Sequence, residues 1–122
     1  MRILIGTDII EVDRIKKALK NENEKFKNRV YTEKEIEYCE SKGIQKFQSY
    51  AARFAAKEAI YKALSSYIKS DYKWTDFEVI NEPNGRPRVK LHIDIKELEN
   101  IDISLSHCKE YAVAYVTVQV EE

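Results

Sequence analysis

Two carboxylates interrupt apolar segments of this sequence. Asp8 lies inside the apolar run 2–10, and Glu58 lies about 40° around a predicted helix from the apolar Phe54. A buried carboxylate is costly unless its charge is offset. Two of them can share a hard cation such as Mg²⁺, which takes one or two carboxylates together with water and substrate phosphates. The pair therefore indicates a metal site made by Asp8 and Glu58, with Mg²⁺ expected and Mn²⁺ as the alternative ion.

Simpler interpretations of both residues stay open. Asp8 could stand at the end of its strand and cap the helix that follows. Glu58 could pair with Lys62, because a glutamate four residues before a lysine is a favourable helical ion pair. A shared cation has the advantage of explaining both carboxylates together.

Two lysines lie on the same predicted helix as Glu58, namely Lys57 and Lys62. Lysines beside a metal held by carboxylates suit a phosphate-bearing substrate, because their ammonium groups stabilise phosphate charge. We therefore expect Lys57 to contact the substrate and Lys62 to act at its phosphates.

Two later segments could also contact phosphate. The turn Asn84-Gly85-Arg86-Pro87 offers a glycine, whose backbone can approach a ligand closely, and an arginine that could bind phosphate. Ser106 and His107 end a strand and could donate hydrogen bonds. An ordinary hairpin turn and a structural histidine are the simpler interpretations. A nucleophilic pair of His107 and Cys108 is not favoured, because neighbours on a strand point to opposite faces.

Residues 14–29 form a basic segment, with seven basic side chains against two acidic ones. Most charge runs are solvated surfaces. This one is lopsided, so it favours an acidic partner protein. Nucleic acid is the competing partner, but Phe26 is the only aromatic residue interleaved with the charges.

The elements that must position these residues indicate an α+β fold. Strand patterns occupy 2–10, 77–80, 89–93, 101–106 and 111–118, and a short helical turn is expected over 94–99. A helix begins at Glu11 or Asp13, a capping box opens a second helix at Thr32, and Gly43 ends it. A long helix covers 45–68. Its apolar stripe consists of Phe47, Tyr50, Ala51, Phe54, Tyr61 and Leu64. Strands clustered late predict a mainly antiparallel sheet packed against this long helix.

Composition limits the class of protein further. The chain has 122 residues, which fits a single domain over 1–122, and 21 basic against 21 acidic side chains. Zero net charge argues against a general nucleic-acid or membrane-surface binder. The longest uncharged stretch is 111–120, whereas a membrane-spanning helix needs roughly 20 apolar residues. Two cysteines are too few for a disulfide framework, so we expect a cytoplasmic protein.

Four motifs together resemble one family. They are Gly6-Thr7-Asp8-Ile9-Ile10-Glu11-Val12, Arg53-Phe54-Ala55-Ala56-Lys57-Glu58-Ala59 with Lys62-Ala63-Leu64, Asn84-Gly85-Arg86-Pro87, and Ser104-Leu105-Ser106-His107. The family is the holo-[acyl-carrier-protein] synthases, the small 4′-phosphopantetheinyl transferases of fatty-acid biosynthesis. The resemblance runs from Arg2 to about Val118. It implies the 4′-phosphopantetheinyl transferase-like fold.

The resemblance also implies an activity. Enzymes of this family transfer 4′-phosphopantetheine from coenzyme A to a serine of apo acyl carrier protein, releasing adenosine 3′,5′-bisphosphate. They need Mg²⁺ and are homotrimers with sites at the subunit interfaces. Two alternatives remain, namely a coenzyme A- or nucleotide-binding module without transfer activity, and a transferase that serves a secondary-metabolite carrier protein.

Residue roles carry over position by position. The resemblance implies that Asp8 and Glu58 bind the metal and that Lys62 acts at the phosphates. Gly85, Pro87 and His107 fall where the family contacts coenzyme A. The docking surface for the carrier protein would be formed by Arg14, Lys17 and Lys20. We expect Glu58, directly or through a metal-bound water, to be the general base, with a hydroxide-like water as the rival.

The sequence departs from the family pattern at two places. The segment Ser65–Ser70 lacks the glycine that usually follows the Lys-Ala-Leu motif. Cys108 stands where threonine or serine is common, which would remove a hydroxyl contact to phosphate.

Overall fold

The computed structural model describes residues 1–22 and 24–122, and its main sheet has the strand order β1-β5-β4 with both pairings antiparallel. The three strands of this sheet are β1 (Arg2–Glu11), β4 (Leu98–His107) and β5 (Tyr111–Val120). A separate antiparallel hairpin is formed by β2 (Phe77–Asn81) and β3 (Pro87–Leu91). The prediction of a mainly antiparallel α+β fold is confirmed.

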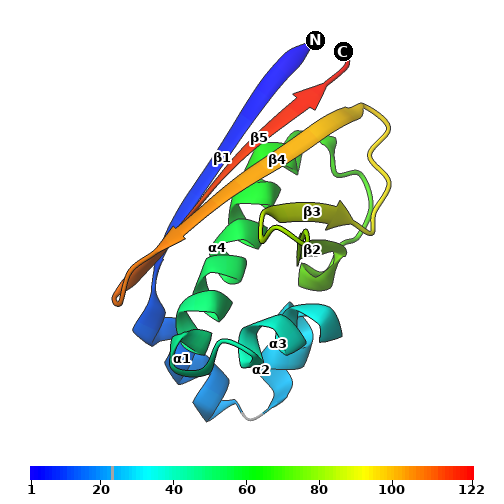
Figure 1. The fold of residues 1–122 in the computed structure, drawn as a ribbon. Helices are drawn as coiled ribbons and strands as arrows, with labels where there is room; N and C mark the ends of the chain where they lie inside the picture. The colour runs from blue at the N-terminus through cyan, green and yellow to red at the C-terminus, as the bar shows by residue number, and fades with distance from the viewer. Residues whose placement is uncertain (23) are drawn as a thin grey trace.

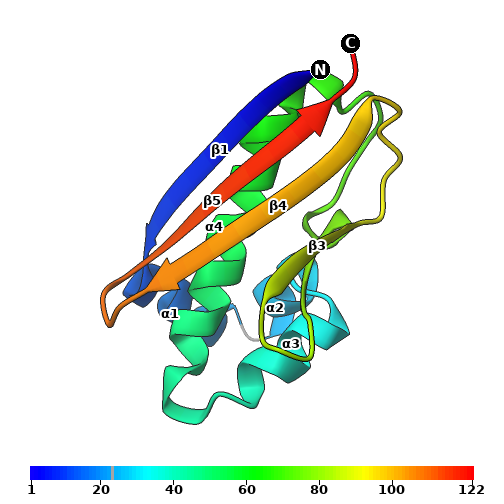
Figure 2. The same ribbon diagram turned by 45° about the horizontal axis from the view of Figure 1, so that its top comes forward.

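The long helix α4 (Lys46–Leu64) crosses one face of the main sheet, and the β2–β3 hairpin lies on another side of the helix (Figure 1). Three shorter helices gather at the end of α4 remote from the two chain termini (Figures 1 and 2). They are α1 (Val12–Asn21), α2 (Glu24–Val30) and α3 (Glu33–Glu40). Among the described residues, no helix is both long enough and apolar enough to cross a membrane.

Several predicted boundaries were wrong. The long helix ends at Leu64 rather than 68, because residues 65–67 tighten into a 3₁₀ turn. The helical turn expected over 94–99 is absent, because β4 already begins at Leu98, which pairs with Val120. Gly43 does not end α3 but opens a 3₁₀ turn, with a φ of 59°. Helix α2 was not predicted. The capping box at Thr32 is present, with Glu35 as its second member.

Gly6 allows β1 to lie directly on the backbone of α4. A Cβ atom added to Gly6 would lie 2.0 Å from the carbonyl oxygen of Ala59. No side chain fits at that distance, so the strand approaches the helix this closely only with glycine. The short side chains of the α4 alanines, including Ala59, leave room for the strand at this contact. The close approach brings Asp8, two residues further along β1, beside the same helix.

The outer face of the main sheet is apolar and uncovered. On β1, Gly6, Asp8 and Ile10 point towards α4, while alternate residues point away, as the twofold period of a strand requires. The apolar run 2–10, which we expected to form a mostly buried strand, is therefore buried on one face only in the single chain. Six residues on this outer face are between 37% and 65% exposed, namely Ile3, Ile5, Ile9, Tyr111, Val113 and Tyr115.

Candidate functional site

Asp8 and Lys62 meet where β1 crosses α4. The Lys62 Nζ donates to Asp8 Oδ1 at 3.1 Å and to the Thr7 carbonyl oxygen at 3.1 Å. Asp8 pairs with Ala114 within the ladder of β1 and β5, three residues before β1 ends, so it is neither at a strand end nor a helix cap. Lys62 forms its ion pair with Asp8, across the strand–helix contact, and not with Glu58 as the simpler interpretation supposed.

Glu58 lies near this pair and senses both charges. Partial burial, followed by the negative charge of Asp8, raises the pKa of Glu58, while Lys62 and Arg14 act in the opposite direction. A cation between the two carboxylates would offset the repulsion between their negative charges. Within residues 1–22 and 24–122, no cluster of three or more His, Cys, Asp or Glu side chains could hold a metal. Two carboxylates alone would leave most ligand positions of a hard cation to oxygen atoms of water and phosphate.

Lys57 does not belong to this cluster, although we expected it to contact the substrate. Its side chain has no exposed surface, and its Nζ donates to Glu35 Oε1 at 2.8 Å and to the carbonyl oxygens of Trp74 and Phe77 at 3.1 and 2.8 Å. Burial lowers the pKa of Lys57, and Glu35 opposes that effect. All three donors are used within the protein, so this part of the prediction is corrected to a structural role.

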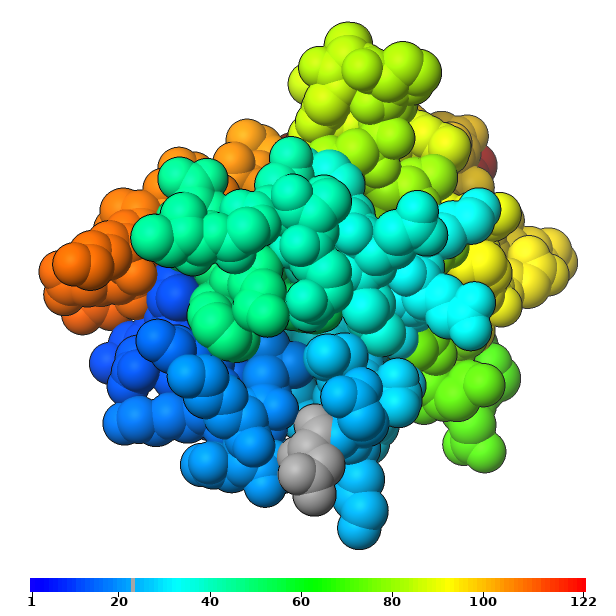
Figure 3. Space-filling model, turned by 60° about the horizontal axis from the view of Figure 1, so that its bottom comes forward, coloured from blue at the N-terminus to red at the C-terminus, as the bar shows by residue number. Residues whose placement is uncertain are grey.

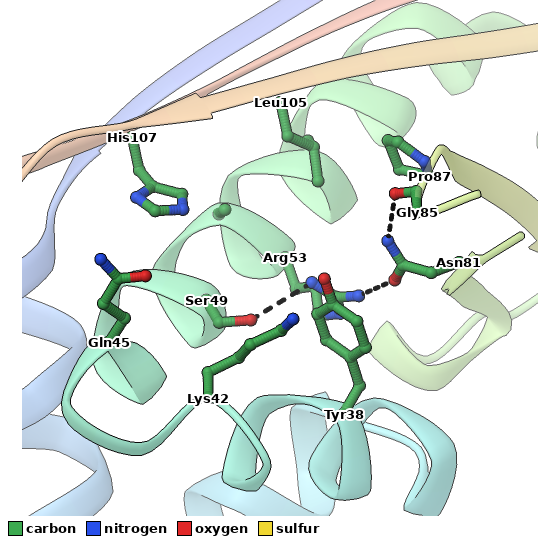
Figure 4. A pocket seen from close by; sticks show the side chains of 11 residues that line it. Tyr38, Lys42, Gln45, Ser49, Arg53, Asn81, Gly85, Pro87, Leu105 and His107 are labelled. Carbon is green, nitrogen blue, oxygen red and sulfur yellow. Dashed lines mark hydrogen bonds between the residues drawn. The ribbon is translucent and has the colours of Figure 1, made fainter. Parts of the chain in front are cut away.

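A second group of polar side chains surrounds a hollow of about 260 Å³ on another side of α4 (Figure 4). The helix, the β2–β3 hairpin, strand β4 and the α3 region all contribute to its wall. The lining residues include Tyr38, Lys42, Gln45, Ser49, Arg53, Asn81, Gly85, Pro87, Leu105 and His107. Gly85, Pro87 and His107 were predicted from the sequence, and the structure brings these three together.

Arg53 lies at the centre of this hollow, which we call the Arg53 pocket, and is only 3% exposed. Its guanidinium donates to Ser49 Oγ and Asn81 Oδ1 and lies 3.9 Å from the centre of the Tyr38 ring. Asn81 in turn donates to the Gly85 carbonyl oxygen at 2.9 Å, which ties the hairpin turn to the arginine. Among the residues that the structure describes, the Arg53 Nε has no hydrogen-bond partner. Because an unpaired buried donor is unfavourable, the pocket is suited to an anionic group.

Sequence reasoning missed most of this pocket. Arg53, Ser49 and Gln45 lie at the start of the long helix, where they look like ordinary polar positions, and Tyr38 and Lys42 come from a separate segment. The usable signal was Arg53, a long charged side chain within an alanine-rich stretch.

Three predicted contacts are placed elsewhere. Arg86 pairs with Asp102 at 3.0 Å and does not line the pocket. The Asn84 side chain caps its own turn by accepting from the Arg86 N–H at 3.0 Å. Ser106 lies between Leu105 and His107 on β4, so its side chain points to the opposite face of the sheet. In the single chain, these positions correct the expectation that Arg86 and Ser106 contact the ligand beside His107.

The two groups lie on opposite sides of α4. Glu58 is five residues after Arg53, about 140° around the helix, and Lys62 is nine residues after it, about 180° around. A single small ligand cannot contact both groups of the same chain.

Basic side chains on α1 are exposed near the first group. Arg14, Lys17 and Lys20 all lie on the surface, and Lys17 also pairs with Asp13 at 3.0 Å. Helix α1 packs against α4, and the positive charge of Arg14 acts to lower the pKa of Glu58. In Figure 3, the blue region that contains α1 lies on the surface of the molecule, at the end remote from the chain termini.

Residues 4–116 match the family model described as the 4′-phosphopantetheinyl transferase superfamily, and the chain belongs to that superfamily. Among curated relatives, it is 48% identical to the holo-[acyl-carrier-protein] synthase of Ruminiclostridium cellulolyticum, over 98% of this chain and 94% of the relative.

Solved structures agree with this assignment. The holo-(acyl-carrier-protein) synthase of Bacillus anthracis, in complex with CoA (3′,5′-ADP), has a TM-score of 0.79 and 37% identity over 97% of this chain and 96% of its own. The Helicobacter pylori holo-[acyl-carrier-protein] synthase, in complex with coenzyme A, has a TM-score of 0.81 and 32% identity over 95% and 100%. The family resemblance and the fold class inferred from the motifs are confirmed.

The placement of the two lysines predicts that the same substitution changes the free energy of unfolding by very different amounts. Lys57→Met leaves Glu35 buried without a cation, so we expect the free energy of unfolding to fall by about 3–5 kcal/mol. Lys62→Met removes a half-exposed ion pair, so it should change the stability by less than about 1 kcal/mol. Urea denaturation of both variants measures the difference. Equal stability losses would contradict the structural role of Lys57.

Proposed function

We propose that this chain is a holo-[acyl-carrier-protein] synthase, which transfers 4′-phosphopantetheine from coenzyme A to a serine of apo acyl carrier protein. Relatives of this name, similar over nearly the whole chain, support the reaction. The observation on the molecule itself that carries it is the Asp8, Glu58 and Lys62 cluster, with the phosphate-compatible Arg53 pocket as its complement. A binding module without transfer activity would not need two carboxylates and a lysine at one point.

In the proposed reaction, the serine oxygen attacks the phosphorus of the phosphate that carries pantetheine. The bond from that phosphorus to the bridging oxygen breaks, and adenosine 3′,5′-bisphosphate leaves. A Mg²⁺ ion held by Asp8 and Glu58 would supply charge neutralisation for the pyrophosphate. Glu58 accepts the serine proton, directly or through a water. Lys62 stabilises the departing phosphate.

We propose that the complete site forms between two copies of the chain, within a homotrimer. Asp8, Glu58 and Lys62 of one copy would hold the pyrophosphate, while the Arg53 pocket of the next would take the 3′-phosphoadenosine. The opposite placement of the two groups on α4 supports this division. The uncovered apolar face of the main sheet, with Ile9 65% exposed, offers the area for subunit contacts.

For the protein partner, we propose an apo acyl carrier protein in the cytoplasm, docked on the exposed basic side of α1. Its serine must reach the carboxylates, and Arg14 on this helix already influences Glu58. Exposed charges of this kind steer association and are screened by salt.

The carboxylates provide the main test of the transfer reaction. Asp8→Asn and Glu58→Gln should each reduce transfer by about 100-fold or more, because metal binding and proton removal are lost while the fold remains. Mass spectrometry of apo acyl carrier protein mixed with coenzyme A and Mg²⁺ measures the phosphopantetheine adduct. Chelation of Mg²⁺ should also stop the wild-type reaction, whereas the exposed Asp94→Asn serves as a matched active control. Wild-type turnover in either carboxylate variant would refute the assignment.

A shared site predicts that two defective variants can restore activity. Glu58→Gln impairs one group, and a Lys42→Ala, His107→Ala double variant impairs the Arg53 pocket. When the two proteins are unfolded together and reassembled in equal amounts, about a quarter of the interfaces should combine two intact groups. We expect transfer activity near that fraction of the wild-type value. Activity equal to the mean of the separate variants would show that each chain works alone.

The docking surface predicts a selective kinetic change. Reversing Arg14 and Lys17 to glutamate should raise the KM for carrier protein by about tenfold and weaken its salt dependence, because charge attraction across α1 is lost. The Kd for coenzyme A should stay within about twofold of the wild-type value, since neither residue lies in the Arg53 pocket. Steady-state kinetics and calorimetry separate the two effects, and an equal loss for both substrates would oppose this docking surface.

A further inference from the structure

The buried guanidinium of Arg53 is held only by neutral groups. Its Nη1 donates to Ser49 Oγ at 3.4 Å, its Nη2 donates to Asn81 Oδ1, and its flat face lies over the Tyr38 ring (Figure 4). Among the described residues, Arg53 takes part in no ion pair, and no aspartate or glutamate lines the hollow. Buried charges are ordinarily paired. Arg53 therefore keeps a positive charge that an anionic ligand can neutralise.

The hydroxyl group of Ser49 connects Arg53 to helix α3. Ser49 precedes Arg53 by four residues, so both lie on the same side of α4. Ser49 is buried, and its hydroxyl donates to Cys39 Sγ at 3.3 Å. A hydroxyl has one hydrogen and two lone pairs. Because the sulfur atom takes the hydrogen, the Ser49 oxygen is left to accept from Arg53.

The thiol of Cys39 is suited to this contact because it is neutral. Cys39 has no exposed surface, and burial raises the pKa of its thiol to about 11, although the charge of Arg53 and the hydrogen bond from Ser49 act in the opposite direction. A thiolate at this position would neutralise part of the arginine charge. The neutral thiol fixes the Ser49 hydroxyl and leaves the positive charge of the pocket intact.

We propose that Cys39 and Ser49 are positioning residues for Arg53, which they hold in the orientation that selects coenzyme A bearing a 3′-phosphate. The inference rests on the proposed function, in which the pyrophosphate lies at the carboxylates of one copy and the 3′-phosphoadenosine in the Arg53 pocket of the next. With the pyrophosphate placed at the carboxylates, the 3′-phosphate is the remaining anionic group of coenzyme A. It is therefore the group that Arg53 would neutralise.

Ordering of Arg53 before the ligand binds is the physical basis of this selection. An arginine side chain has many rotamers, so fixing one of them during binding costs conformational entropy. Hydrogen bonds to Ser49 and Asn81 fix the guanidinium in advance, and the bond to Cys39 fixes the Ser49 hydroxyl itself. Loss of either Cys39 or Ser49 should weaken the interaction with the 3′-phosphate and spare the rest of the ligand.

A comparison of coenzyme A with 3′-dephospho-coenzyme A tests the inference, because the two ligands differ only in this phosphate. Ser49→Ala should raise the Kd for coenzyme A by about fivefold and leave the Kd for the dephospho ligand within about twofold. Cys39→Ala should act in the same direction by about threefold, since the hydroxyl keeps its place but loses its fixed orientation. Ser49→Thr retains the hydroxyl and should keep the wild-type ratio of the two constants. Isothermal titration calorimetry in the presence of Mg²⁺ measures each Kd.

A double-mutant cycle shows whether Ser49 acts through Arg53. In an Arg53→Met background, Ser49→Ala should change neither constant by more than about 1.5-fold. A fivefold loss that persists there would mean that Ser49 acts on the ligand directly, and it would overturn the positioning role.

Two further results would overturn the inference, namely a wild-type ratio of the two constants in Ser49→Ala or Cys39→Ala and an equal weakening of both ligands. Reduced stability alone would leave the ratio unchanged. If a thermal melt shows that Cys39→Ala is unfolded, Cys39→Val fills the space without a hydrogen-bond acceptor and is measured in its place. Adduct formation by the wild type tests the transferase function separately, because the ratio depends on binding and not on transfer.

Discussion

The buried ion pair between Lys57 and Glu35 holds together the parts of the molecule that build the Arg53 pocket. Glu35 joins α3 to β2 by accepting from the Val79 N–H at 2.8 Å, and it also completes the capping box at Thr32. Lys57 joins α4 to the carbonyl groups of Trp74, before β2, and of Phe77, the first residue of β2. Tyr38 on α3 and Asn81 on β2 can therefore meet Arg53 on α4. A charged pair without exposed surface is costly to bury, and here every donor of the lysine is matched, so the pair fixes one arrangement of these elements.

A second constraint sets the position of the carboxylates. Gly6 lets β1 lie on the backbone of α4, where a larger residue would not fit. This contact puts Asp8 next to Lys62 and near Glu58. Polar groups therefore lie on two sides of α4, and a different strand of the main sheet contributes to each side. β1 approaches the carboxylate side, while β4 brings His107 to the Arg53 side.

The neutral overall charge conceals an uneven distribution that follows from this arrangement. Positive side chains cover α1, and the negative charge of Asp8 contributes to the raised pKa of Glu58. The Arg53 Nε has no hydrogen-bond partner among the described residues. Each of these local imbalances corresponds to one component of the proposed reaction: an acidic protein, a divalent cation and a phosphate-bearing nucleotide.

The fold class, the family and the residue types of the Asp8, Glu58 and Lys62 cluster could be predicted from the sequence alone. Period-two and helical patterns are local, the capping box at Thr32 depends on residues three apart, and Asp8 and Glu58 stand out because each breaks its own local pattern. Only the tertiary structure decided that Lys57 is buried whereas Lys62 faces the cluster. Five residues apart on a helix, the two lysines point about 140° apart, and which direction is the interior depends on what packs there. The same holds for Arg86, which binds Asp102 from a distant strand, and for the Arg53 pocket, whose walls come from four separate segments. Contacts between residues far apart in the chain leave no periodic signal, so they become visible only when the chain is folded.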